Sequence, residues 1–374
     1  MRRWIASGAM AAALLLSVSM ASGVSAGSGG AARAVVPAGI SSPQVARLGA
    51  YTEVTMELDS HGHIDAVAAG NSGLWYITNA SGSFTRKRIT SVVSRSDSHG
   101  HDGQPSLALD SHDHAYVAFA RNDCDDCAPS VPLGVYYLTN KSGSWSTPKK
   151  LAGLSMDWPT IQVNGSHISV SWERCECIPK QTGQVWFGTN ASGSWTKTKV
   201  AQNADSPSLA LNSAGLPRIA FVQNGIRYAI GSTKLGNFSI AKVTGSTSHD
   251  SRPSLALSPS GLARVAWSRY GSAAVAGVYD SRRSATGSWT TRREDANEGP
   301  PAIATDDETT WQIGTAQLSN GVRVLLANAG GNTGVTTDGQ ALADKVDVDT
   351  RGGQTVWMYT VVDGTPAGIY YVHT

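Results

Sequence analysis

One phrase recurs along this chain, and its spacing restricts the fold more than any other feature. It begins Pro105-Ser106-Leu107-Ala108-Leu109, passes through Val117-Ala118-Phe119 and Gly134-Val135-Tyr136-Tyr137, and closes at Ser142-Gly143-Ser144-Trp145. The apolar position held by Leu109 has counterparts spaced 43 to 54 residues apart, at Leu58, Val163, Leu211, Leu257, Thr305 and Val348. Repeats of this length that contain several short strands are typical of β-propeller blades.

Each repeat contains four segments with the character of a strand. In the clearest repeat these are Pro105–Leu109, Tyr116–Ala120, Gly134–Thr139 and a fourth strand that begins at Trp145. Turn-forming residues separate the segments, and a proline is tolerated as the first residue of a strand. The repeats therefore predict an all-β fold, a seven-bladed β-propeller of four-stranded antiparallel blades. The asparagines of the last turn, Asn79, Asn140 and Asn190, are interpreted as turn residues rather than glycan sites, and the recurring tyrosines, Tyr76, Tyr137, Tyr228, Tyr279 and Tyr371, are expected to pack between blades.

The last repeat is incomplete, because the chain stops after Gly368–Thr374, which resembles a third strand. An open ring would leave an unpaired strand edge, which propellers avoid. The segment Gln44-Val45-Ala46-Arg47-Leu48 precedes the first repeat and has the character of a strand. We therefore expect this N-terminal strand to pair with the final strand and close the ring.

The N-terminus has the features of a secretory signal peptide. Met1-Arg2-Arg3 is basic, Ala11–Leu16 is apolar, and Val24-Ser25-Ala26 has the small residues of a cleavage site. We expect residues 1–26 to be the signal peptide, 27–43 a flexible leader and 44–374 a single propeller domain. The predicted location is secreted and extracellular.

The charge balance excludes some partners. Residues 1–26 contain Arg2, Arg3 and no acidic residue, so the remaining chain holds 28 basic and 28 acidic residues. Nonspecific nucleic-acid binding needs an excess of Lys and Arg, as does binding to an anionic membrane surface. We therefore expect neither nucleic acid nor membrane as a partner, and we expect a monomer.

The phrase, together with Tyr-x-Thr-Asn-x-Ser-Gly-Ser-Trp, resembles the repeats of exported bacterial β-propellers related to the sialidase-like superfamily. The resemblance covers about residues 50–374. Sialidases carry Asp-boxes of the form Ser-x-Asp-x-Gly-x-Thr-Trp between the third and fourth strands. The matching segment Thr139–Trp145 is one residue shorter and lacks the Asp, so these boxes are degenerate. The resemblance implies the fold and leaves the activity undetermined.

Three arginines lie two positions after the central aromatic residue of the second strand. They are Arg121, Arg174 and Arg269, and Tyr359 occupies the same position near the C-terminus. The planar guanidinium fork suits carboxylate, sulfate or phosphate groups. If these side chains converge on one face, they form a ligand site; the alternative is that each pairs with a nearby acid such as Glu173 or Asp123.

Acidic residues precede the first strand of nearly every repeat, at Asp102, Asp157, Asp205, Asp250, Glu298 and Asp344. Their recurrence favours a structural role as acceptors of backbone N–H groups over a cation site or general acids. Asp157 differs because Trp158 follows it and interrupts the phrase. Trp158 is the candidate for stacking on a sugar, and the alternative is a tryptophan that covers the top of a blade.

Histidine pairs occupy two turns between first and second strands, at His61 with His63 and at His112 with His114. A further cluster is His99-Gly100-His101-Asp102. No established metal motif is matched, so we interpret the pairs as exposed turn residues and predict no metal site and no cofactor.

All four cysteines lie in two loops after second strands, as Cys124-Asp125-Asp126-Cys127 and Cys175-Glu176-Cys177. An exported protein meets an oxidising environment, which favours disulfides. Cys124–Cys127 is a plausible bridge, whereas Cys175–Cys177 would be strained, so pairs between the two loops are the alternative.

Three functions are compatible with these observations. The favoured one is a binding module for an extracellular glycan or protein, at a face that includes Arg121, Arg174, Arg269, Trp158, Asp157 and Tyr359. The alternative is a sialidase-like glycoside hydrolase or polysaccharide lyase, which would need two suitably placed carboxylates or a Tyr/His pair on that face. A structural cell-surface protein is the third. The degenerate Asp-boxes favour binding over catalysis.

Overall fold

The computed structural model divides the chain into two units, residues 1–33 and 34–374. It describes residues 44–46, 51–70, 72–91, 101–122, 133–153, 156–176, 182–245, 249–296, 299–308, 311–318, 322–328, 331–336, 346–361 and 368–373, all in the second unit. The predicted signal peptide and leader lie outside these ranges. Within them, no helix has the length and apolarity needed to cross a membrane.

Six four-stranded antiparallel sheets each consist of strands consecutive in sequence. Three of them hold β2 (Tyr51–Leu58), β3 (Ile64–Gly70), β4 (Gly73–Thr78) and β5 (Thr85–Arg88); β6 (His101–Leu109), β7 (Ala115–Asn122), β8 (Gly134–Thr139) and β9 (Lys149–Gly153); and β10 (Met156–Asn164), β11 (His167–Glu176), β12 (Thr182–Thr189) and β13 (Thr196–Gln202). The others hold β14 (Asp205–Leu211), β15 (Pro217–Val222), β16 (Ile226–Thr233) and β17 (Gly236–Lys242); β18 (Asp250–Leu257), β19 (Ala263–Arg269), β20 (Gly277–Arg283) and β21 (Trp289–Asp295); and β22 (Pro301–Ala304), β23 (Gln312–Leu318), β24 (Val322–Asn328) and β25 (Gly331–Thr336).

A further four-stranded sheet combines the two ends of the described chain. Its order is β1-β28-β27-β26, with β26 (Val346–Arg351), β27 (Gln354–Val361), β28 (Gly368–His373) and β1 (Gln44–Ala46). β1 runs antiparallel to β28, and Gln44 lies opposite Tyr371.

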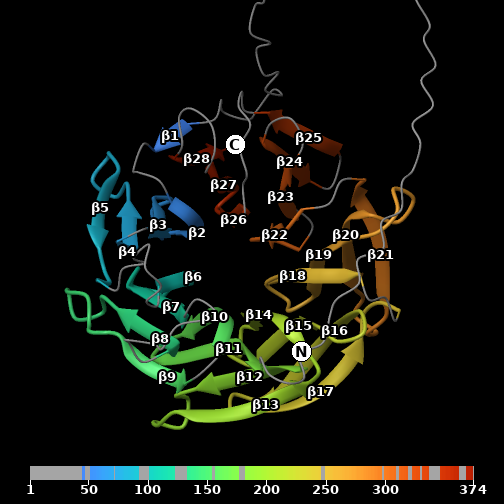
Figure 1. Ribbon diagram of the computed structural model, residues 1–374, viewed down its shortest axis with the longest axis horizontal. Helices are drawn as coiled ribbons and strands as arrows, with labels where there is room; N and C mark the ends of the chain where they lie inside the picture. The colour runs from blue at the N-terminus through green and yellow to red at the C-terminus, as the bar shows by residue number, and fades with distance from the viewer. Residues whose placement is uncertain are drawn as a thin grey trace, which may run out of the picture. The chain divides into compact units, whose positions relative to one another are not determined.

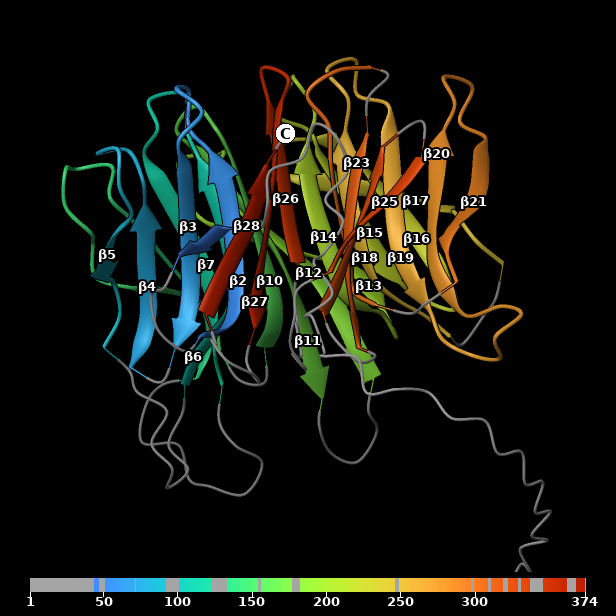
Figure 2. The same cartoon turned by 90° about the horizontal axis from the view of Figure 1, so that it is seen from above.

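The sheets surround a central axis, with their first strands innermost (Figure 1). Each first strand packs against the first strands of its two neighbours, and β26 packs against β2. Seen from the side, the turns between first and second strands lie on one face of the ring (Figure 2). The predicted all-β propeller of four-stranded antiparallel blades is thus confirmed.

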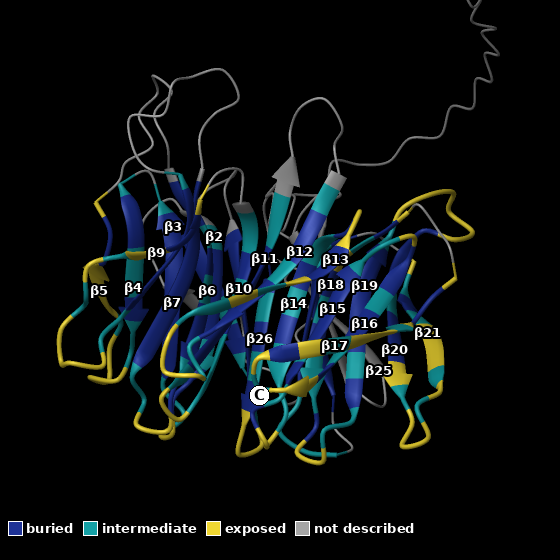
Figure 3. Cartoon of the chain, turned by 90° about the horizontal axis from the view of Figure 1, so that it is seen from below, coloured by how far each residue is buried: buried dark blue, intermediate teal, exposed yellow. Residues whose placement is uncertain are grey.

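Aromatic pairs join neighbouring blades, as the recurring tyrosines predicted. A ring on a third strand meets the ring that follows the next blade's third strand, with centroids 5.1 to 5.4 Å apart, in Tyr76–Trp145, Tyr137–Trp195, Phe187–Phe238, Tyr228–Trp289 and Phe84–Tyr371. Tyr279 instead stacks on Trp267 of its own blade. The inner strands are largely buried, whereas the turns and much of the outermost strands β5, β17 and β21 are exposed (Figure 3).

The asparagines predicted as turn residues act as such. The Oδ1 atoms of Asn79, Asn140 and Asn190 each accept the N–H at the start of the second strand, at 2.7 Å. Two predicted strand starts in this repeat are wrong: β6 begins at His101 rather than at Pro105, and β9 begins at Lys149 rather than at Trp145. For β9 the reason is local, because the Trp145 ring packs on Tyr76 and Pro148 has no N–H to donate.

Candidate functional site

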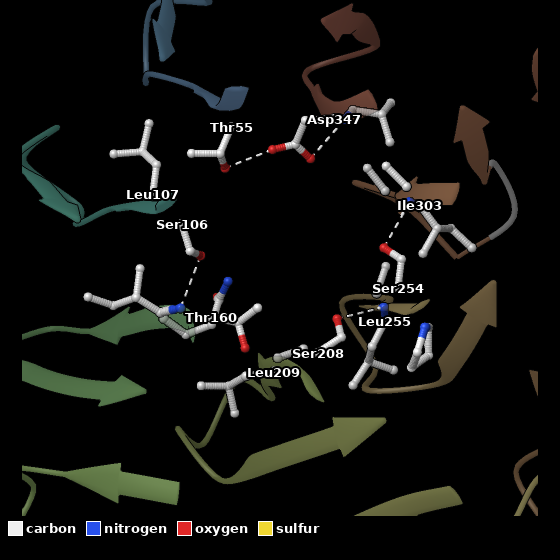
Figure 4. A pocket seen from close by; sticks show the side chains of 18 of the residues that line it. Thr55, Ser106, Leu107, Thr160, Ser208, Leu209, Ser254, Leu255, Ile303 and Asp347 are labelled. Carbon is white, nitrogen blue, oxygen red and sulfur yellow. Dashed lines mark hydrogen bonds between the residues drawn. The ribbon is translucent and has the colours of Figure 1, made fainter. Parts of the chain in front are cut away.

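A cavity of about 660 Å³ follows the central axis, between the innermost strands of the blades. Figure 4 shows side chains from these strands pointing into it. It is the natural place to look for a ligand, because propellers and other ring-shaped folds enclose such cavities at their centres.

Serines of the repeated phrase hold the wall of the cavity together. The hydroxyl oxygens of Ser106, Ser208 and Ser254 accept N–H groups from the next blade's innermost strand, at 3.0 to 3.2 Å. The donors are Ile161, Leu255 and Ile303, and the bonds are drawn in Figure 4. The serine of the Pro-Ser-Leu segment, which occurs at residues 105–107, 207–209 and 253–255, therefore has a structural role, which is to connect neighbouring blades.

The residue before this proline differs from blade to blade. Four such residues have positive φ values of 50 to 51°, and all four line the cavity: Gln104, Trp158, Ser206 and Arg252. Each lies in a β-bulge, where the register with the second strand shifts. A bulge commonly redirects a side chain. We call these four residues the channel mouth.

Side chains of one blade fix the bulge of the next. The carboxylate of Glu53 accepts the N–H of Gln104, and Oε1 of Gln104 accepts the N–H of Trp158 at 2.8 Å. Oε2 of Glu173 accepts the N–H of Ser206 at 3.1 Å. These bonds satisfy backbone groups that the bulge removes from the sheet, so the backbone of the mouth is held in place before any ligand arrives.

Trp158 and Arg252 meet across the mouth. The guanidinium carbon of Arg252 lies 5.6 Å from the centroid of the Trp158 ring, a cation–π contact. Arg252 is exposed, and no acidic side chain within the described ranges forms an ion pair with it. An aromatic surface and a donor-rich cation thus face the same cavity.

Besides Glu53, three carboxylates line the cavity where β26, β2 and β6 adjoin. Glu57 accepts the N–H of Leu109 at 2.9 Å, and Asp349 accepts the N–H of Leu58 at 2.7 Å. Asp347 accepts the Thr55 hydroxyl at 2.8 Å and a backbone N–H at 3.0 Å. Because each of the three carboxylates accepts hydrogen bonds from a neighbouring strand, we assign all three to the packing of the blades.

Burial shifts the pKa values of two of these acids. Burial, together with the charge of Asp349, raises the pKa of Glu57 well above its usual value. Burial also raises the pKa of Asp349 to about 6, although hydrogen bonds from Leu58 and Thr350 oppose the shift.

Two of the predicted arginines lie away from the cavity and point at acids of their own blade. Arg121 contacts Asp102 through Nε at 2.6 Å and Nη2 at 3.1 Å. Arg269 contacts Asp250 in the same way, at 2.5 and 3.1 Å. The recurring acids therefore do act structurally in these blades, although their partners are guanidinium groups rather than the backbone N–H groups we expected.

The other predicted site residues are placed as follows. Arg174 is half-buried on β11 opposite Met156, and Asp157 lies opposite Glu173. Tyr359 is fully buried and stacks on Tyr370, and burial raises its pKa. Of the six candidate ligand-binding residues, all within the described ranges, Trp158 lines the cavity and the other five do not.

A carboxyl group with an unusual pKa lies behind the mouth. Burial raises the pKa of Glu173 to about 7, and the charges of Asp205 and Asp157 add to the shift against a hydrogen bond from Ser206. A carboxyl group that titrates near neutrality is able to donate or accept a proton at working pH.

The disulfide prediction concerns residues that are not described. Cys124, Cys127 and Cys177 lie outside the described ranges, and Cys175 is described only as part of the backbone of β11.

Sequence reasoning missed Gln104 and Arg252 as site residues. A signal was present, because the position before the strand's proline varies more between repeats than the positions that follow it. Trp158 was noticed only because an aromatic residue there is conspicuous.

No protein-family model matches the sequence, and neither does any curated protein. Among solved structures, the chain is similar to a protein of unknown function from Dyadobacter fermentans, with a TM-score of 0.53 and 12% identity over 73% of this chain and 94% of that one. It is also similar to the polysaccharide lyase Uly1, with a TM-score of 0.51 and 10% identity over 88% and 90% of the two chains.

A sialidase from Trypanosoma rangeli, in complex with 2,3-difluorosialic acid, gives a TM-score of 0.52 and 9% identity. The match covers 91% of this chain and 59% of the sialidase. At these identities the likeness establishes a propeller fold shared with sialidases and a lyase, and nothing about activity.

Proposed function

We propose that this propeller is an extracellular binding module, and that its channel mouth binds a glycan or a protein segment. The observation that carries the proposal is the position of Trp158, whose ring lines the cavity beneath the exposed Arg252. An aromatic face packs against the C–H face of a sugar, and a guanidinium group donates paired hydrogen bonds to a carboxylate or sulfate.

The organisation of the mouth supports this proposal. The backbone geometry is the same in four blades, while the side chains are Gln104, Trp158, Ser206 and Arg252. Different side chains on a fixed backbone give a site with directional specificity, because the ligand meets a different chemical group on each side.

A second candidate is an enzyme of the glycoside hydrolase or lyase type, like some structural neighbours. Glu173, with a pKa of about 7, would be the general acid of such an enzyme, and Asp157 lies opposite it in the sheet. The binding role is favoured because Arg121 and Arg269 are each committed to an aspartate rather than gathered around a pocket.

Binding is tested with a glycan array probed by the purified protein, followed by titration calorimetry with the strongest acidic glycan. We expect Trp158→Ala and Arg252→Ala each to weaken binding by about tenfold or more. Arg292→Ala, at an exposed arginine on β21, is the matched control and is expected to bind normally. Arg174→Ala tests whether the predicted β11 arginine contributes.

The enzymatic candidate has a separate test. The same glycans are incubated with wild-type protein and with Glu173→Gln, and the products are analysed by mass spectrometry. Turnover that disappears in Glu173→Gln would favour the enzyme; intact glycans in both samples would favour the binding module.

We further propose that β1 completes a seventh blade and closes the ring. The register of Gln44 with Tyr371 supports this closure, as does the contact of Phe84 with Tyr371, whose ring centroids are 5.4 Å apart. Export through the signal peptide at residues 1–26 is part of the same proposal.

A further inference from the structure

Two adjacent turns carry the same unusual triad, on the face of the ring opposite the channel mouth. The turn between β2 and β3 contains Asp59-Ser60-His61-Gly62-His63, and the turn between β6 and β7 contains Asp110-Ser111-His112-Asp113-His114. One triad is Asp59, His61 and His63, and the other is Asp110, His112 and His114. In each triad, every residue offers one atom able to bind a metal, and these three atoms lie within 4.8 Å of one another.

The turn itself does not need these histidines. The same backbone bond closes the turns that begin at Asp59, Asp110, Asn212 and Ser258. In the latter two turns the histidine positions hold Ala214 with Leu216 and Ser260 with Leu262. The fold of the turn therefore leaves the presence of two histidine pairs unexplained.

The carboxylate of Asp59 divides its two oxygens between the backbone and the histidines. Oδ1 accepts the N–H groups of His61 and His63, both at 2.8 Å, as a turn aspartate does. Oδ2 lies 2.8 Å from Nδ1 of His63 and 3.9 Å from Nδ1 of His61. One oxygen is thus left facing two imidazole nitrogens.

A fourth donor comes from the neighbouring turn. Oδ2 of Asp113 lies 3.7 Å from Nδ1 of His61, and the Asp113 carboxylate also binds the N–H and hydroxyl of Ser60. Donor atoms around a tetrahedral zinc ion are about 3.3 Å apart, given bonds of about 2.0 Å. The His61 side chain is 71% exposed, so a small rotation brings its nitrogen into range.

We propose that Asp59, His61, His63 and Asp113, the first-turn cluster, bind a divalent late first-row transition-metal ion such as Zn²⁺ or Cu²⁺. Two imidazoles and two carboxylates are a donor set that suits these ions. Asp110, His112 and His114, the second-turn cluster, bind the same ion more weakly, because the next turn, Asn164-Gly165, provides no acid equivalent to Asp113.

Because the chain carries two similar clusters, variants of one cluster can be compared with variants of the other. Tag-free protein, treated with a chelator, is titrated with ZnCl₂ by calorimetry. We expect two binding events per chain. His61→Ala/His63→Ala removes the tighter event, and His112→Ala/His114→Ala removes the weaker one.

Two single variants sharpen the assignment. Asp113→Asn keeps a residue that tolerates positive φ and is expected to weaken the tighter event by about tenfold or more. His167→Ala, at the first residue of β11, is expected to leave both events unchanged. Absence of zinc binding, or an isotherm that neither double variant alters, would overturn the proposal.

A spectroscopic readout guards against misfolded variants. Because Ala214 and Leu216 occupy the same positions in an equivalent turn, metal-free double variants should melt like the wild type. With one equivalent of Cu²⁺, the electron paramagnetic resonance spectrum of the wild type should show coupling to nitrogen. His61→Ala/His63→Ala moves the ion to the second-turn cluster and keeps this coupling, whereas replacing both histidine pairs removes it. A spectrum with oxygen ligands alone would contradict the site.

Discussion

Arg121 and Asp102 form a two-point ion pair between β7 and β6, with N–O distances of 2.6 and 3.1 Å. The Arg121 side chain is 10% exposed, and its guanidinium carbon also lies 4.5 Å from the centroid of the Tyr136 ring. Arg269 repeats the arrangement with Asp250 and Tyr279. Two of the three predicted arginines thus form ion pairs with two of the recurring acids.

This pairing predicts a large loss of stability when one partner is removed. Asp102→Ala leaves the buried Arg121 without its counter-charge, which should lower the free energy of unfolding by about 3–5 kcal/mol. Denaturant unfolding measures the effect. The double variant Asp102→Ala/Arg121→Met should recover much of the loss; an equal or greater loss would show that the pair is not the cause.

The serine contacts between blades predict a smaller effect. Ser208→Ala removes the acceptor for the Leu255 N–H, so we expect a loss of about 1 kcal/mol in the free energy of unfolding. Ser142→Ala, in an exposed turn, is the control and should change stability by less than about 0.5 kcal/mol. Equal melting of the two variants would argue against a stabilising role for these bonds.

Much of the blade was predictable from sequence because the repeated phrase recurs at a regular spacing, which locates the strands and turns of each blade. The bounds of β8 match the expected third strand, and Asn79, Asn140 and Asn190 cap their turns as expected. The ion pairs were not predictable, since Asp102 and Arg121 are 19 residues apart and meet only through the register of β6 with β7. The channel mouth depends likewise on bulges that sequence periodicity does not reveal.

The raised pKa of Glu173 predicts a pH dependence of stability. The folded state binds this proton up to about pH 7, whereas the unfolded state releases it near its usual pKa of 4.5. The unfolded state therefore holds fewer protons between these values, and stability falls as the pH rises through that window. Above it the contribution is constant.

Glu173→Gln isolates this effect, because its amide oxygen is still able to accept the Ser206 N–H. Melting temperatures measured from pH 4.5 to 8 should fall less steeply for the variant than for the wild type. The remaining slope is expected from Asp349 and Glu57, whose pKa values are also raised. Parallel curves for the two proteins would refute a raised pKa of Glu173.

Ring closure by β1 predicts a loss on truncation. A chain starting at Tyr51 lacks the strand that covers the edge of β28, so its melting temperature should fall substantially. A chain starting at residue 35 keeps β1 and should melt like the wild type. Identical melting of both shortened chains would contradict closure.

The most direct test of the account is the affinity of the channel mouth for its ligand. The dissociation constant of the strongest array glycan is measured for the wild type, Trp158→Ala and the Arg292→Ala control. The account predicts weakening by about tenfold or more for Trp158→Ala alone. An unchanged constant for Trp158→Ala would contradict it, because the binding site would then lie away from the channel mouth.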